Sequence, residues 1–134
     1  VTSFVRIGED VYSPLIPEGE ADILIGMEPI EALRAAKYVG SKTIAIVNIK
    51  PIKPVPVNLG LEEYPPIEKI IELLSKLSGK TIGFNAYEIA KHAGSTRVVN
   101  SVMLGALTAL KPLPIPREII LDTLFESVPK GMEK

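Results

Sequence analysis

The sequence contains no cysteine and only one histidine, His92. The absence of cysteine excludes disulfides, thiolate nucleophiles and cysteine-ligated metal clusters within this chain. A histidine-based metal site would need carboxylates or a second chain to complete it, because only one imidazole is available. The sequence also lacks a nucleophile-elbow motif, a phosphate-loop lysine motif and a GxGxxG turn. We therefore predict no metal site and no catalytic residue in this chain.

The sequence also has no marked excess of positive or negative charge and no long apolar run. Fifteen basic and sixteen acidic residues give a formal net charge of -1, and without a basic patch we expect no nucleic-acid partner. Every apolar run is far shorter than the roughly 20 residues that span a membrane, and no signal peptide is visible. We therefore expect no membrane partner and a cytoplasmic location. The length suits a single domain, residues 1–134, and the twelve prolines are compatible with a thermophile.

Residues 21–50 contain the pattern around which the chain is organised. Two short apolar runs, residues 23–25 and 43–47, have no polar alternation and are therefore predicted to be buried strands. The segment between them has helical spacing, with Pro29 in the first turn and the helix end predicted at Gly40. Strand, helix and strand in about thirty residues form a parallel crossover unit, whose binding crevice lies at the carboxyl ends of its strands. The residues predicted at that edge are Gly26, Met27, Glu28 and Asn48.

The remaining pattern predicts a three-layer α/β/α fold with a mostly parallel sheet and an N-terminal β-hairpin. The hairpin is expected within residues 1–12 and should extend the sheet. An amphipathic helix is predicted from Pro66 to an end at Gly79. A third strand follows at residues 80–85, with its core at 81–84, and then a short helix at 86–92.

Residues 98–110 are apolar on nearly every side, so we predict a helix that is buried in the domain or against another chain. Gly105 in its middle costs about 1 kcal/mol relative to alanine, and close approach of another backbone would justify that cost. A final amphipathic helix is predicted, followed by a polar, frayed tail at residues 130–134. The inner stripe of that last helix consists of Ile120, Leu124 and Val128.

The segment from residue 48 to residue 66 is rich in proline, which favours an extended, polyproline-like run. Two interpretations remain open for it. The first is a connector or edge arm. The second is an arm that packs on a partner subunit through Val55, Val57 and Leu59.

The strongest candidates for binding an anion are Gly94, Ser95, Thr96 and Arg97, with Asn100 one helical turn further on. Small residues, a predicted helix N-terminus and a guanidinium group together suit phosphate. The alternative is an ordinary helix start, in which Asn100 serves as a cap.

A second group of candidate binding residues is Gly26, Met27 and Glu28, at the edge where ligands bind in open sheets. Glu28 would repel phosphate, so we expect it to face a ribose, an adenine amine or a lysine of a partner. The alternative for Glu28 is a first-turn carboxylate facing the helix dipole, worth about 0.3–1 kcal/mol. His92 is likewise expected near a helix end, where the dipole stabilises it.

Three segments carry a longer pattern. The first is VRIG followed by YSPLIP and an AD pair, the second is IGMEPIEALRAAKYV, and the third is AxxxGSTRxxNxxMLGA from Ala90 to Ala106. In this order, and over nearly the whole chain, they resemble the gamma-type domain of the 2-oxoacid:ferredoxin oxidoreductase superfamily. Within the superfamily the chain most resembles the beta subunit of indolepyruvate ferredoxin oxidoreductase. The pyruvate and branched-chain oxoacid branches stay open as alternatives.

The resemblance implies a subunit or domain that is not active alone. The whole complex would oxidatively decarboxylate an aryl 2-oxoacid, acylate coenzyme A and reduce ferredoxin. Thiamine diphosphate, magnesium and iron–sulfur clusters are expected in a large partner subunit, and no cofactor is expected in this chain. Coenzyme A is the candidate ligand for the anion site. The rival from another class is a scaffolding module without a ligand of its own.

The resemblance also implies about fifty or more further residues before this region, consistent with ordinary domain sizes. In the family they hold a first strand, a glycine-rich turn and a helix, none of which is found in the sequence. We therefore expect residues 1–134 to be a gamma-type domain that lacks its N-terminal part, as a fragment, a processed chain or a sequence with a missing start.

Overall fold

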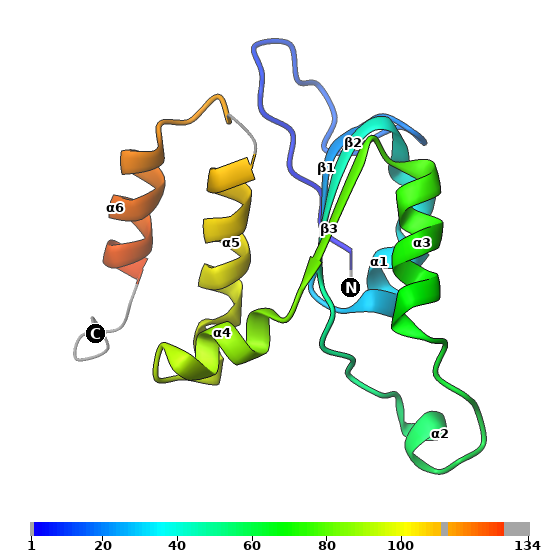
Figure 1. The fold of residues 1–134 in the computed structure, drawn as a ribbon. Helices are drawn as coiled ribbons and strands as arrows, with labels where there is room; N and C mark the ends of the chain where they lie inside the picture. Colours follow the sequence, from blue (N-terminus) through cyan, green and yellow to red (C-terminus); the bar gives the residue numbers. More distant parts are fainter. Residues whose placement is uncertain (1, 111–112, 128–134) are drawn as a thin grey trace.

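Three parallel strands form the sheet of this protein, whose computed structural model describes residues 2–110 and 113–127 (Figure 1). In spatial order the strands are β1 (Ala21–Gly26), β2 (Val39–Asn48) and β3 (Lys80–Phe84). The register pairs Leu24 of β1 with Ala45 of β2, and Ala45 with Thr81 of β3. β2 is therefore the central strand of the described sheet.

Two helices, α1 and α3, cover one face of this sheet (Figure 1). The elements on this side are α1 (Pro29–Arg34), the 3-10 helix η1 (Ala36–Tyr38) and α3 (Ile67–Leu77). Val47 of β2 packs there with Ala32 of α1 and with Ile70 and Leu74 of α3, and all four side chains are buried. Pro29 can begin α1 because the first N–H groups of a helix have no partner inside it.

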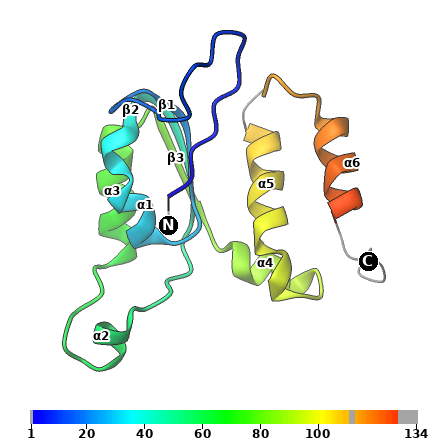
Figure 2. The ribbon, with the colours of Figure 1, turned by 180° about the vertical axis from the view of Figure 1, so that it is seen from behind.

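The opposite face of the sheet is covered by α5, with α6 standing beside α5 (Figures 1 and 2). The elements on this side are α4 (Ala86–His92), the 3-10 helix η2 (Thr96–Val98), α5 (Val99–Leu110) and α6 (Arg117–Ser127). Ile46 of β2 packs here with Met103 and Leu107 of α5. No residue of α6 is buried. Val128, predicted on its inner stripe, and the predicted tail at residues 130–134 lie outside the described residues.

A parallel sheet between two helical layers confirms the predicted three-layer α/β/α fold. The predicted cores at residues 23–25, 43–47 and 81–84 lie within β1, β2 and β3. The helix predicted from Pro66 is α3, and the short helix predicted at 86–92 is α4. The apolar periodicity of the sequence therefore locates the main elements correctly.

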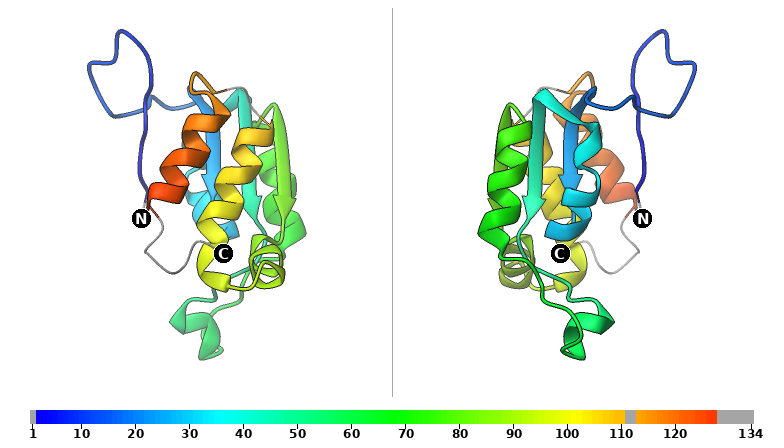
Figure 3. Two further views of the ribbon diagram at one scale, coloured as in Figure 1. Left: turned by 90° about the vertical axis from the view of Figure 1, so that its left-hand side faces the viewer. Right: turned by 90° about the vertical axis from the view of Figure 1, so that its right-hand side faces the viewer.

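The N-terminal segment, residues 2–20, differs from the prediction in one respect. It runs out from the body and back, as a hairpin does (Figure 3), but it forms no strand and does not extend the sheet. Most of its side chains are exposed, so its alternating apolar residues have no second layer against which to bury a face. The guanidinium of Arg6 joins the two arms instead, donating to the carbonyl oxygens of Ser13 at 3.0 Å and Leu15 at 3.2 Å.

Two glycines have roles that differ from the predicted ones. Gly40 lies inside β2 and not at a helix end, because α1 already stops at Arg34. A Cβ atom on Gly40 would lie 2.1 Å from the carbonyl oxygen of Gly19, so this glycine permits close approach of two backbones. Gly105 has the opposite environment: apart from its chain neighbours and the backbone of its own helix, no atom of the described chain lies within 4 Å of the position that its Cβ would take. The predicted close backbone neighbour of Gly105 is therefore absent from the described residues.

Residues 49–66 form a long loop that leaves the carboxyl end of β2 and returns to the start of α3. The short helix α2 (Val55–Asn58) lies in this loop, which projects away from the body (Figure 1). No residue of α2 is buried. The proline-rich segment is therefore a projecting loop with one helical turn. Its position is compatible with both interpretations of the sequence, a connector and an arm that packs on a partner.

Candidate functional site

Polar side chains follow the three strands at the edge of the sheet where each strand ends. Glu28 lies two residues after β1, Asn48 is the last residue of β2, and Asn85 directly follows β3. Because the strands are parallel, their carboxyl ends meet at this one edge, which is where open α/β sheets bind ligands. Asn85 caps α4 through its Oδ1, which accepts a hydrogen bond from the N–H of Glu88 at 3.1 Å. The edge is thus the first place to look for a site.

The Asn48 side chain is buried and connects the β1–α1 turn with α4. Its Nδ2 donates to the carbonyl oxygen of Met27 at 3.1 Å. Its Oδ1 accepts from the backbone N–H of Ala86 at 3.1 Å and from that of Lys50 at 3.3 Å. Both polar atoms of the amide therefore serve the fold, as buried polar groups must.

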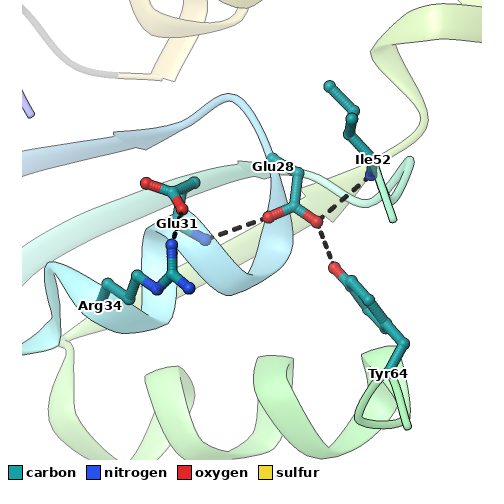
Figure 4. Close-up of polar contacts among 5 residues, drawn as sticks. All are labelled: Glu28, Glu31, Arg34, Ile52 and Tyr64. Carbon is teal, nitrogen blue, oxygen red and sulfur yellow. Dashed lines mark hydrogen bonds and ion pairs between the residues drawn. The ribbon is translucent and has the colours of Figure 1, made fainter. Parts of the chain in front are cut away.

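Glu28 is only 6% exposed, and its carboxylate accepts hydrogen bonds from three donors (Figure 4). Oε2 accepts from the N–H of Glu31 at 3.1 Å and so caps α1. Oε1 accepts from the N–H of Ile52 at 3.3 Å and from the hydroxyl of Tyr64. A buried carboxylate is tolerated when its own chain supplies such donors. Both oxygens of Glu28 therefore face groups of this protein.

Among the described donors to Glu28, Tyr64 is the one that uses an ionisable side chain. Burial raises the pKa of the Tyr64 phenol, and the hydrogen bond to Glu28 and the negative charge of that carboxylate raise it further. The phenol therefore remains a protonated donor over the ordinary pH range. Its ring also packs against the core that contains Val47 and Leu74, so the residue joins the loop to the body in two ways.

The other two residues of this group, Gly26 and Met27, also have structural roles. Gly26 is buried, and a Cβ atom there would lie 2.5 Å from the Cβ of Ala32, so glycine lets α1 pack directly on β1. The Met27 carbonyl accepts the hydrogen bond from Asn48, while its side chain is 38% exposed. Of residues 26–28, only the Met27 side chain reaches solvent to a substantial degree.

The second candidate group lies where α4 passes through η2 into α5. Gly94 has a φ angle of 103°, which glycine adopts without strain. The Oγ of Ser95 caps η2 by accepting a hydrogen bond from the N–H of Arg97 at 3.3 Å. Thr96, Arg97 and Asn100 are exposed, and the Arg97 guanidinium makes no hydrogen bond or ion pair with another described residue. The predicted helix start is present, and its guanidinium is available to an anion.

The structure keeps the two predicted groups separate. No hydrogen bond or ion pair joins residues 26–28 to residues 94–100 in the part of the chain that is described. His92, between them in sequence, lies on the surface, where its Nδ1 donates to the carbonyl oxygen of Glu88 at 2.7 Å. A shallow hollow of about 420 Å³ lies elsewhere, within the N-terminal segment around Tyr12.

Two kinds of site have no support in residues 2–110 and 113–127. No group of three or more His, Cys, Asp or Glu side chains there could hold a metal ion. No helix within these ranges has the length and apolar character needed to cross a membrane.

The family described as "Pyruvate ferredoxin/flavodoxin oxidoreductase" matches residues 1–134. The chain belongs to this family. Because the match extends over the whole chain, both candidate groups lie within the pyruvate ferredoxin/flavodoxin oxidoreductase domain.

Curated proteins resemble this pyruvate ferredoxin/flavodoxin oxidoreductase chain closely enough to be compared individually. It is 38% identical over 130 residues to the indolepyruvate oxidoreductase subunit IorB of Pyrococcus horikoshii, and 37% identical over 130 residues to that of Thermococcus kodakarensis. The corresponding subunit of Archaeoglobus fulgidus is 42% identical over 124 residues. These matches cover 96%, 96% and 92% of this chain, but only 64%, 64% and 61% of the relatives. No solved structure matches the chain.

Sequence reasoning missed the partners of Glu28 in this domain. The sequence suggests a first-turn carboxylate as the alternative for Glu28, and the structure places Glu28 at the N-cap of α1, where it accepts from Glu31. The contacts of Glu28 with Ile52 and Tyr64 do not follow from the sequence pattern. These residues lie 24 and 36 positions away, so no local spacing reveals the contact. The sequence offers one weak indication of this contact, which is the position of Tyr64 between a proline-rich stretch and a predicted helix.

Proposed function

We propose that this chain is a domain of an indolepyruvate-type 2-oxoacid:ferredoxin oxidoreductase, and that it has no turnover alone. The observation that carries the proposal is the family match over residues 1–134, together with relatives named indolepyruvate oxidoreductase subunit at 36–42% identity. The reaction of the assembled enzyme would be oxidative decarboxylation of an aryl 2-oxoacid. Coenzyme A would receive the acyl group, and ferredoxin would receive the electrons.

The chemistry of the donor set supports the placement of the cofactors in another subunit. Iron–sulfur clusters need thiolate ligands, and this sequence has no cysteine. The carboxylate nearest the sheet edge, Glu28, already accepts from three donors of its own chain. The sequence therefore does not fit a cluster, and the described residues contain no group of acidic side chains that could hold the magnesium of thiamine diphosphate, so we assign those groups to a larger partner.

Exposed apolar side chains support the need for such a partner. Val5 of the N-terminal segment and Leu61 of the loop are each 75% exposed, and Phe125 of α6 is 64% exposed. Single exposed apolar residues are ordinary on a protein surface, but here they occur on three separate segments. The exposed Gly105 lies on α5, which stands beside α6 (Figure 1).

Within the assembled enzyme we propose that residues 94–100 contact the phosphates of coenzyme A. The exposed Arg97 guanidinium offers a fork of donors, and Gly94 leaves room for close approach to the backbone. The start of α5 adds the positive end of a helix dipole. Residues 26–28 have a smaller share in this proposal, through the partly exposed Met27 side chain.

The proposed function is tested by reconstitution. Indolepyruvate, coenzyme A, thiamine diphosphate, magnesium and an oxidised ferredoxin are mixed with this chain, with a candidate large subunit, and with both. We expect ferredoxin reduction only with both proteins, and faster reduction with indolepyruvate than with pyruvate or a branched-chain 2-oxoacid. Turnover by this chain alone would contradict the proposal, and a preference for pyruvate would move the protein to another branch.

One observation favours a second candidate, a scaffolding module without a ligand. The exposed residues of the anion group, Thr96, Arg97 and Asn100, could equally contact a partner protein. Calorimetric titration with coenzyme A, in the presence and absence of the large subunit, separates the two functions. If Arg97→Ala weakens the binding of coenzyme A, the ligand site is supported. If the same change prevents assembly of the subunits, the scaffold is supported.

A further inference from the structure

Within the loop of residues 49–66, residues 51–64 hydrogen-bond to the rest of the described chain through Glu28, whereas Ile49 donates to the carbonyl oxygen of Phe84 at 3.0 Å and so belongs to the sheet edge. Near its start, the N–H of Ile52 donates to Oε1 of Glu28 at 3.3 Å. Near its end, the hydroxyl of Tyr64 donates to the same oxygen (Figure 4). One carboxylate oxygen thus holds both ends of the loop, and Lys50 adds a contact to Asn48 at the very start.

The part of the loop between these two contacts is held by its own hydrogen bonds. The N–H of Leu61 donates to the carbonyl oxygen of Pro56 at 2.9 Å, and the N–H of Leu59 donates to that of Val55 at 3.0 Å. The side-chain amide of Asn58 donates to the carbonyl oxygen of Lys53 at 3.1 Å. The loop therefore has an internal structure that does not depend on the sheet.

Little apolar burial supplements the two Glu28 contacts along the projecting part. Ile52 is 73% exposed, and no residue of α2 is buried. Segments with few buried contacts open locally at a free energy far below that of global unfolding. Pro51, Pro54 and Pro56 restrict the backbone, so the segment is stiff between its ends.

We propose that residues 51–64 form a strap that opens and closes as one unit, and that the Glu28 carboxylate is the latch that holds it closed. Opening leaves Oε1 without its two donors, at the carboxyl edge of the sheet, while Oε2 continues to cap α1 through Glu31. A ligand or partner that binds only one of the two positions would shift the equilibrium between them. The inference does not depend on the proposed function, because both contacts belong to this chain.

Hydrogen exchange of individual backbone amides tests the strap in the intact protein. Tyr64→Phe removes one hydroxyl donor but keeps the aromatic ring in the core, and Glu28→Gln removes the charge but keeps an acceptor. Each change should speed exchange of the Ile52 amide about tenfold, because hydrogen bonds to charged groups are among the stronger ones. The amides of Leu59 and Leu61 should keep their rates, because their acceptors, Val55 and Pro56, lie within the strap and move with it. Low concentrations of urea should leave exchange of the Ile52 amide unchanged, whereas they should speed exchange of the β2 amides, which requires unfolding of the domain.

Tyr38→Phe is the matched control, because the Tyr38 ring packs on Phe4 and its hydroxyl makes no hydrogen bond with another described residue. It should leave the loop amides unchanged. Exchange of Leu59 and Leu61 that accelerates together with Ile52 in Tyr64→Phe would overturn the inference, since the loop would then unravel and not move as a unit. Exchange of Ile52 that rises with urea as steeply as that of β2 would also overturn it, because the loop would then open only when the whole domain unfolds. Unchanged exchange in both latch variants would show that Glu28 holds nothing closed.

Discussion

At the carboxyl end of β1, the Glu28 carboxylate is buried and accepts from three donors of its own chain. At the start of α5, the Arg97 guanidinium is exposed and makes no hydrogen bond or ion pair with a described residue. Both segments carry a charged side chain beside a helix N-terminus, and position in the fold alone would give them similar roles. Their hydrogen bonds distinguish the two side chains. Glu28 has donors within the chain and stabilises the domain, whereas the Arg97 guanidinium is open to a ligand or partner.

The comparison also explains which change should disturb the fold and which should disturb function. A buried charge with three donors cannot be removed without leaving those donors unpaired or dependent on water. An exposed guanidinium without a partner can be removed at little cost to stability. Substitutions at the two positions should therefore have opposite signatures.

The largest effect is expected for Glu28→Ala. The change removes the cap of α1 and leaves the Tyr64 hydroxyl without its acceptor, so the free energy of unfolding should fall by about 2–3 kcal/mol. Urea unfolding followed by circular dichroism measures this loss. Arg97→Ala, in the same assay, should stay within about 0.5 kcal/mol of wild type. Equal losses for both variants would remove the distinction between the two regions.

A functional effect of intermediate size is expected for Arg97→Ala in the assembled enzyme. The KM for coenzyme A should rise about tenfold, equivalent to about 1.4 kcal/mol, because a forked contact to phosphate is lost. The KM for the oxoacid should barely change. Lys91→Ala is the control, because it removes an exposed cation from neighbouring α4 without changing the proposed site. If Lys91→Ala had the same effect, general electrostatic attraction and not a specific contact would be responsible.

The smallest effect concerns the alkaline limit of stability. The pKa of Tyr64 is raised in the folded protein, so the folded state holds its proton where the unfolded state, near pH 10, has begun to lose it. The contribution of Tyr64 is thus fully present below about pH 10 and is lost as pH rises further. Tyr64→Phe should flatten the decline in stability above that pH. A decline of wild-type steepness in Tyr64→Phe would contradict the assignment.

The main elements of the fold could be predicted because their patterns are local. Strands β1 and β2 correspond to apolar runs without polar alternation. The inner side of α3 corresponds to an apolar stripe that includes Ile70 and Leu74. Both patterns depend on residues that are near one another in sequence. The strands predicted in the N-terminal segment are absent, since alternation gives a strand only where a second layer covers one side. The predicted helix end at Gly40 is also wrong, because this glycine permits the close approach of the backbone at Gly19, which is distant in sequence.

The candidate site was predictable only in part. The helix start near Ser95 follows from small residues before an apolar run, and the structure has it. The sequence does not reveal that the Glu28 carboxylate has its hydrogen-bond donors within the chain, because two of them belong to Ile52 and Tyr64, far along the chain. Whether a polar residue at a sheet edge is free or satisfied is decided by such distant contacts.

The most direct test of this account is the protection of backbone amides by coenzyme A in the assembled enzyme. Hydrogen exchange is compared with and without the ligand, with attention to residues 94–100 and to residues 26–31. We predict slower exchange at residues 94–100 on addition of coenzyme A, and no change at residues 26–31, where Glu28 already has its donors. Protection at residues 26–31 alone, or at neither segment, would contradict the assignment of the open region to the ligand and of the closed region to the fold.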